Sequence, residues 1–466
     1  MWSELLMAAG VPTPITQPSG RAIPTAARLV VTDSENTATG DAERGTIRLH
    51  LPTNNVIRSR LLFWGDLTVP LLGIPTVPLT LHAGDRVLAR DEQGRALISL
   101  SAQPETVLHI GMDIGRLFRV MRFGIPNRAN LDRDGNGEIQ PLDLLPAIDR
   151  SYTAVPFQDL FIERALTTLE QQLPCPFLRT RGLPAHITSL LVLTADQDYA
   201  SDATVLAMAE ELAAREARAT FLLTDPHIGH RADMHVQAGE TAPEPLSHEA
   251  IEDLLEFGHD FGAHPFPAQP ADIRAHAVGV RNLTGMPALL FRNHHLRWFG
   301  YQSIPETEAS SGGRMNLDVM PIALRGSTLP CVGFPAGSAH PIHMLADEEH
   351  RLPVLQQMTI IDDYSLRRST YAEMRSAVPE LLEAAHVIIA SARRQQVPIV
   401  VNAHPTIYKF APDWLNTLLE ISEVRTFSGN EWLSFVTNRR NTSIPARRCV
   451  DRQPLVLPAG VELRHH

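Results

Sequence analysis

The stretch LLVLTADQDY, residues 190–199, decides the fold of the larger part of this chain. Its apolar run has the length of a strand and ends at two carboxylates, Asp196 and Asp198. In a strand, side chains two residues apart point to the same side. We therefore expect both acids where the strand leaves the core, the edge at which α/β folds bind ligands. Such a pair can hold a metal and supply a general base, while an acidic turn is the plainer alternative.

The chain around this stretch alternates between strand-like and helix-like segments. Further strands are expected at residues 219–223, 260–263, 288–291 and 399–401, and helices at 202–215, 247–257 and 371–394. That order predicts a parallel sheet or a barrel, and hence an α/β fold.

The first part of the chain has a different pattern, in which short β-like runs alternate with turn signals. The turn at 91–95 lies between the runs 86–89 and 96–100, which predicts a hairpin. We expect four parts in all: a smaller β-rich or α/β N-terminal domain over 1–150, a helical linker over 151–184, a barrel-like domain over 185–440, and a tail over 441–466.

Residues 132–143, DRDGNGEIQPLD, match the pattern of a calcium-binding loop. The candidate ligands are Asp132, Asp134, Asn136, Glu138 and Asp143. Asp143 is shorter than the usual glutamate at the last position, and nearby prolines do not suit two flanking helices. A complete EF-hand is therefore not expected, and a lone structural calcium loop and a plain turn both stay open.

Composition excludes several classes of protein. The 466 residues suffice for two or three domains, and a net charge of -11 without a long basic run argues against nucleic-acid binding. The three cysteines are far apart and fit neither a disulfide framework nor a zinc finger. No secretory signal and no apolar run of about 20 residues is evident, so cytoplasmic residence is the default expectation.

Acids and histidines follow several of the expected strands. After the acid pair come His264, then Arg292 with His294 and His295, then His404, each directly behind an apolar run. One aspartate and two histidines form a common ligand set for a divalent metal. A lone histidine is more often structural, but repeated placement at strand ends favours a metal site.

These motifs together resemble the polysaccharide deacetylase (NodB-homology, carbohydrate esterase) family over roughly residues 185–440. The family's first motif, Thr-Phe-Asp-Asp or Asp-x-Asp, is matched by TADQD at 194–198, and its second, Gly-His-Glu-Ile-Gly-x-His, by GHDFGAH at 258–264. ATFLL at 219–223 resembles the family's Ala-Thr-Phe-Phe strand, and weaker matches are FR at 291–292 and IVVNAH at 399–404. The resemblance implies a distorted (β/α) barrel that removes N- or O-acetyl groups with a bound divalent metal.

The resemblance also implies a role for each matched position. Asp196 would be the general base and Asp198 a metal ligand. His264 would be the first histidine ligand, His404 the general acid, and Arg292 the residue that orients the base. Zinc is the expected ion, with cobalt, nickel and iron as alternatives.

One family position is changed in this chain. The family's second histidine ligand falls four residues after the first, where this chain has Ala268. His294 or His295 could supply the missing ligand. We favour His294, because it lies two residues beyond Arg292 and would share its side of an extended chain.

The predicted function is that of a metal-dependent hydrolase that removes acetyl, or related acyl or amide, groups from a carbohydrate-like substrate. Trp298 and Tyr301 are weaker candidates for stacking on a sugar, and Asp318 for contacting substrate or supporting His404. Two alternatives stay open. One is an inactive barrel that binds a carbohydrate, which the change at Ala268 supports, and the other is a calcium-stabilised binding or scaffold protein.

Overall fold

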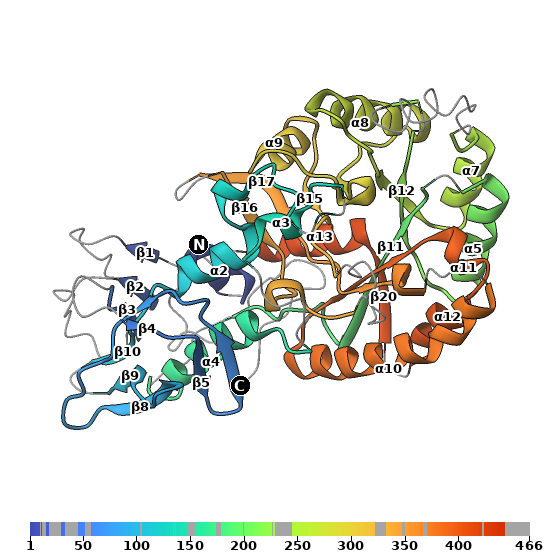
Figure 1. The fold of residues 1–466 in the computed structure, drawn as a ribbon. Helices are drawn as coiled ribbons and strands as arrows, with labels where there is room; N and C mark the ends of the chain where they lie inside the picture. Colours follow the sequence, from blue (N-terminus) through green and yellow to red (C-terminus); the bar gives the residue numbers. More distant parts are fainter. Residues whose placement is uncertain are drawn as a thin grey trace. The chain divides into compact units, whose positions relative to one another are not determined.

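The fold is known from a computed structural model, which describes residues 1–9, 11, 15–17, 29–32, 45–51, 57–102, 105–133, 135, 137–146, 154–173, 179–198, 200–225, 227–228, 245–321, 332–346, 350–366, 371–421 and 424–442. Contacts divide the chain into two compact units. Unit 1 comprises residues 1–122, 157–185 and 438–466, and unit 2 comprises 123–156 and 186–437 (Figure 1). Residues 123–150, expected in the N-terminal domain, thus belong to unit 2, and most of the expected linker belongs to unit 1.

Unit 1 is built on a mixed sheet. In sheet order its strands are β1 (Ile15–Gln17), β2 (Leu29–Thr32), β3 (Gly45–Leu49), β10 (Thr106–Ile110), β9 (Ala96–Ser101), β8 (Arg86–Asp91), β5 (Leu61–Trp64) and β6 (Leu67–Pro70). The first four are parallel and the rest antiparallel, and β8 and β9 form the predicted hairpin. A separate short pair joins β4 (Ile57–Arg58) to β7 (Pro75–Thr76).

Aromatic packing holds a helix against this sheet. Helix α4 (Phe157–Glu170) contacts β3, β6 and β10. Its fully buried Phe161 meets the rings of Trp64 and Phe118 edge-on, with centroids 5.5 and 5.6 Å away. Offset and edge-on geometries are the favoured ones for aromatic pairs. Two shorter helices, α1 (Trp2–Ala8) and α2 (Ile114–Phe123), complete the described helices that begin in this part.

Unit 2 contains the predicted parallel sheet. In sheet order its strands are β16 (Ile342–Leu345), β17 (Arg351–Gln356), β15 (Met315–Asn316), β14 (Leu290–Phe291), β13 (Asp260–Ala263), β12 (Thr220–Leu223), β11 (Ser189–Asp196), β19 (Ile399–Ala403) and β18 (Ile361–Asp362), and β20 (Val424–Ser428) pairs with β11. Only β16 runs antiparallel among these described strands. No described pairing joins β16 to β18, so a closed barrel stays a prediction.

Helices surround these strands (Figure 1). They are α5 (Asp202–Ala214), α7 (His248–Glu256), α8 (Pro270–Thr284), α9 (Ser303–Ser310), α10 (Tyr371–Gln395), α11 (Pro405–Tyr408), α12 (Asp413–Leu419) and α13 (Gly429–Asn441), with α3 (Pro141–Leu144) from the segment before unit 2's sheet. Every residue of β11, β12, β14 and β19 is buried. Burial on both faces explains why these strands are continuous apolar runs.

The sheet order decides where the site lies. Strands β15, β14, β13, β12, β11, β19 and β18 are successive neighbours, and all are parallel. Residues that directly follow these strands therefore meet at one edge of the sheet, whatever their separation along the chain.

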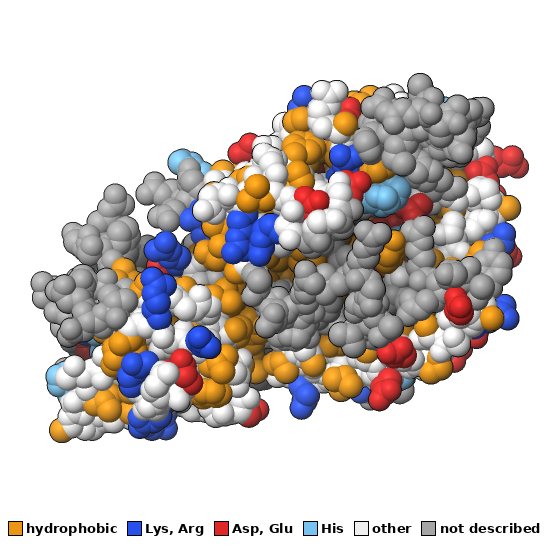
Figure 2. Space-filling model, viewed as in Figure 1, with side chains coloured by type: hydrophobic (Ala, Val, Ile, Leu, Met, Phe, Trp, Pro, Cys, Tyr) orange, Lys and Arg blue, Asp and Glu red, His pale blue; other side chains and the backbone are white. Residues whose placement is uncertain are grey.

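The outer surface is mixed in character. Figure 2 shows acidic and basic side chains both spread among hydrophobic and uncharged ones on the face in view. Within the described part of the chain, no helix combines the length and apolar character needed to cross a membrane.

Candidate metal centre

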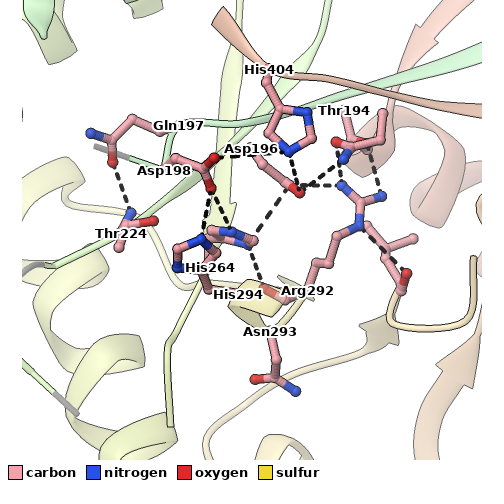
Figure 3. Close-up of polar contacts among 12 residues, drawn as sticks. Thr194, Asp196, Gln197, Asp198, Thr224, His264, Arg292, Asn293, His294 and His404 are labelled. Atoms are coloured by element: carbon pink, nitrogen blue, oxygen red, sulfur yellow. Dashed lines mark hydrogen bonds and ion pairs between the residues drawn. The ribbon is translucent and has the colours of Figure 1, made fainter. Parts of the chain in front are cut away.

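The sequence-predicted acids and histidines converge at the carboxyl edge of the unit 2 sheet (Figure 3). Asp196 ends β11, His264 follows β13, Arg292 and His294 follow β14, and His404 follows β19. Asp198 lies in a turn with φ of 50°, so the two acids are brought together by a turn and not by an extended strand.

The turn at 196–198 is held by the neighbouring strand. Gln197 N donates to Leu222 O at 3.0 Å, and its buried side chain accepts a hydrogen bond from Thr224 N at 2.9 Å. Asp198 is therefore kept in its left-handed conformation by fixed partners. That conformation is rare in residues other than glycine, although aspartate tolerates it better than most.

Three donor groups could hold a divalent ion. Asp198 Oδ1 lies 3.1 Å from His264 Nε2 and 3.5 Å from His294 Nε2, and the three donor atoms lie within 4.8 Å of one another. His264 Nδ1 lies 2.7 Å from the carbonyl oxygen of Arg292. Because a carbonyl only accepts, Nδ1 donates to Arg292 O, and Nε2 faces Asp198, where, against the effect of burial, Asp196 and Asp198 raise the pKa of His264. Nε2 is the nitrogen that could bind a metal, which would take the place of its proton. This orientation by an outer partner is typical of metal-binding histidines, and the set fits an open zinc-type site.

His294, and not His295, reaches this cluster. The His294 ring lies 5.1 Å from the His264 ring, and burial lowers the pKa of His294 to about 3 against the opposing effect of Asp198. The imidazole is therefore neutral at pH 7, the form that binds metals. The His295 side chain is 47% exposed and lies 3.9 Å from Glu138. Ala268 is exposed, and its N–H donates to Asp272 at 2.8 Å.

Asp196 is held differently from Asp198. Arg292 Nη1 donates to Asp196 Oδ1 at 2.7 Å, and Asn402 Nδ2 donates to Oδ2 at 2.9 Å. Burial would raise the pKa of Asp196, but Arg292, His264 and His404 outweigh it and lower that pKa. Asp196 is thus an ionised, oriented carboxylate at neutral pH.

The buried Arg292 guanidinium is itself fixed by four neighbours besides Asp196. It donates to Asn402 Oδ1 at 2.6 Å, Thr194 Oγ1 at 3.1 Å, Thr359 Oγ1 at 2.8 Å and the Leu317 carbonyl at 3.5 Å. A buried guanidinium with this many acceptors is held in one orientation. Arg292 therefore fixes the direction of the Asp196 carboxylate.

His404 pairs with an acid that the sequence analysis did not identify. Its Nδ1 lies 2.6 Å from Asp363 Oδ1, and its backbone N–H donates to Asp363 Oδ2 at 2.9 Å. Burial opposes protonation, but Asp363 and Asp198 raise the pKa of His404 well above its usual value. Nε2 lies 3.8 Å from Asp196 Oδ2 and 3.9 Å from Asp198 Oδ2. A protonated His404 thus faces both acids.

A sequence signal for Asp363 exists. The run IIDD at 360–363 repeats the pattern of an apolar strand that ends in acids, as at 190–198. Asn402, the other residue that was missed, lies inside the quoted motif at 399–404. Its amide bridges Asp196 and Asp362, whose oxygens lie 2.9 and 3.1 Å from Nδ2.

The three candidates for substrate contact do not line the cluster as expected. Trp298 is 4% and Asp318 is 1% exposed, so neither offers a face to a sugar. Asp318 accepts from Asn293 N at 2.6 Å and from Asn293 Nδ2 at 2.7 Å. It therefore supports the loop at Asn293 and not, as was expected, His404. Tyr301 is partly buried, and its hydroxyl donates to the Gly124 carbonyl at 3.4 Å.

The calcium-like loop uses its carboxylates in another way. Asp132 accepts from the amides of Gly135 and Gly137 at 2.8 and 2.9 Å. Asp143 is 4% exposed and accepts from Gln140 N at 2.9 Å and Arg133 N at 2.8 Å, capping α3. These contacts describe a turn whose carboxylates are hydrogen-bonded to amides of the same segment. Asp134 and Asn136 lie outside the described residues.

No family model matches the chain, and no curated protein matches it. Among solved structures, it is similar to three proteins in particular. A chitin deacetylase from the fungal pathogen Colletotrichum lindemuthianum is 13% identical over 53% of this chain and 88% of that one, with a TM-score of 0.32. A family 4 acetyl xylan esterase from Clostridium thermocellum, in complex with a cobalt ion, is 12% identical over 53% and 91%, with a TM-score of 0.30. A CE4 family pseudoenzyme from Bacillus anthracis is 12% identical over 53% and 66%, with a TM-score of 0.30.

The resemblance to polysaccharide deacetylases is thus found again among solved structures, over about half of the chain. TM-scores near 0.3 are too low to carry an argument about chemistry.

Proposed function

We propose that unit 2 is a metal-dependent hydrolase that removes an acetyl or related acyl group from a carbohydrate-like substrate. The observation that carries the proposal is the division between the two acids. Asp198 faces two imidazoles that can share a metal with it, whereas Asp196 is held by Arg292 and Asn402. The protonated His404 lies 3.8 Å from Asp196 and 3.9 Å from Asp198. Acyl hydrolysis needs these functions separately: an electrophile, a base and an acid.

Asp198, His264 and His294 would hold the ion, for which zinc is the first candidate and cobalt, nickel and iron are alternatives. When bound, such an ion supplies Lewis-acid polarisation of the acyl carbonyl and lowers the pKa of water. These three residues leave coordination positions for water and substrate, as catalytic sites require.

The remaining residues would move the protons. Asp196 takes a proton from the attacking water, whose hydroxide part becomes bonded to the acyl carbon. His404 gives its Nε2 proton to the leaving amine or alkoxide as the bond to the acyl carbon breaks. The distance of 3.8 Å between His404 Nε2 and Asp196 Oδ2 supports an acid and a base that act on the same substrate.

The test is acetate release from N-acetylated chitooligosaccharides and from acetylated xylan by the full chain. We expect mass spectrometry to find one transition-metal ion per chain. Chelation should lower the activity at least about 100-fold, and Zn²⁺ or Co²⁺ should restore it. A protein that binds no transition metal, or one that stays inactive with metal bound on both substrates, would overturn the proposal.

The pair formed by His404 and Asp363 predicts a pH effect. His404 must be protonated to act as an acid, so activity falls as pH rises through its pKa, which Asp363 raises. In Asp363→Asn the amide retains an acceptor for His404 but loses the charge. We expect the basic limb of the kcat profile to move to lower pH by about one unit or more. An unshifted basic limb would show that His404 is not the titrating acid.

A further inference from the structure

His294 lies beside a strained turn that its own sequence does not favour. His295 and Leu296 have φ of 55° and 54°. Residues other than glycine adopt such values only where their surroundings impose them. Contacts from outside the segment must therefore fix this turn, and with it the direction of the His294 side chain.

Residues 130–133, 135 and 137–140, which we call the brace, supply those contacts. Four of them join the brace to residues 295–300: Gln140 Nε2 donates to His295 O at 2.7 Å, Trp298 N to Ile139 O at 2.8 Å, Gly300 N to Asn130 Oδ1 at 2.7 Å, and Arg297 Nε to Glu138 Oε2 at 3.1 Å. The brace includes most of the calcium-like loop. The brace lies in the segment 123–156, which belongs to unit 2. This segment comes well before the strands of the unit 2 sheet in the sequence.

The other side of His294 is held as well. Asp318 binds both nitrogens of Asn293, and His294 N donates to Pro265 O at 2.7 Å. The Phe266 ring lies 4.8 Å from the His294 ring. Contacts from Asp318 and Pro265 thus hold the chain at Asn293 and His294. On the C-terminal side of His294, Gln140 holds the carbonyl of His295.

We propose that Gln140 is a positioning residue for the metal ligand His294, acting through the carbonyl of His295. This inference rests on the proposed function. The brace then compensates for Ala268: a ligand taken from an irregular turn needs an outside support that a ligand on a regular element would not need. Asp143 accepts from Arg133 N and from Gln140 N, which gives that support a fixed shape.

Gln140→Glu tests the contact with little change of volume. Gln140 also starts α3 through reciprocal capping with Asp143, and Glu retains an acceptor oxygen for that cap. It loses the N–H that His295 O accepts. We expect the affinity for Zn²⁺ and Co²⁺, measured by chelator competition, to fall about 10- to 100-fold. The visible absorption of bound Co²⁺ should change too, because it reports ligand geometry.

Two further variants keep the test decisive. Asp132→Asn changes a side chain of the same brace that accepts from the amides of Gly135 and Gly137. It should leave the affinity for Co²⁺ within about twofold and the Co²⁺ spectrum unchanged. Glu138→Gln weakens the pair with Arg297, and should lower affinity by up to about fivefold. If the unchanged protein binds one Co²⁺ and Gln140→Glu matches it in affinity and spectrum, the inference is wrong while the proposed function stands. Absence of metal in the unchanged protein overturns both.

Discussion

Asp196→Asn is expected to lower kcat for acetate release by about 10²- to 10⁴-fold while the bound metal stays in place. The amide oxygen can still accept from Arg292 Nη1, which lies 2.7 Å from Asp196 Oδ1. It cannot take a proton from water. The three proposed ligands are untouched, so metal content by mass spectrometry should equal that of the unchanged protein.

Asp198→Asn is the matched control, two residues away in the same turn. It removes the charge that faces His264 and His294, so metal and activity should be lost together. Metal loss of equal size in both variants would contradict the division between base and ligand. Asp196→Asn also takes a carboxylate from the buried Arg292, which destabilises the fold. Rates must therefore be compared well below the measured Tm of each variant.

The strand ends of unit 2 could be predicted because their signal is local. An apolar run followed at once by an acid or histidine needs only neighbouring residues to be recognised, and parallel strands bring such ends together. His264 and His404 were found in this way. The choice of His294 assumed an extended chain. The backbone is extended at Asn293, with φ of -77° and ψ of 135°, and a 3₁₀ turn begins at His294.

Other features could not be predicted, since they depend on contacts between distant segments. Asp363 meets His404 across 41 residues, and Gln140 meets His295 across 155. No periodicity encodes such pairs. The burial of Trp298 likewise follows from what packs over it, and an amphipathic ring suits both a sugar site and a core. In the calcium-like pattern, Asp132 and Asp143 accept from amides of the same segment, and calcium binding there stays a prediction.

His294→Ala is expected to weaken metal binding by about 10²- to 10³-fold. This is one ligand's share of the roughly 10–16 kcal/mol that a full ligand set provides, or about 3–4 kcal/mol. His295→Ala should leave affinity within about threefold, because its half-exposed ring lies near Glu138 and not Asp198. Chelator competition with Zn²⁺ measures both.

The opposite ranking of these two variants would assign the ligand to His295. Equal and large losses in both would mean that the shape of the turn matters more than either imidazole. Gln140→Glu then separates the cases, since it disturbs the turn and leaves both rings in the chain. If the variant with both His294→Ala and His295→Ala still binds the metal, neither histidine is a ligand. Asp198 and His264 would then be an incomplete ligand set.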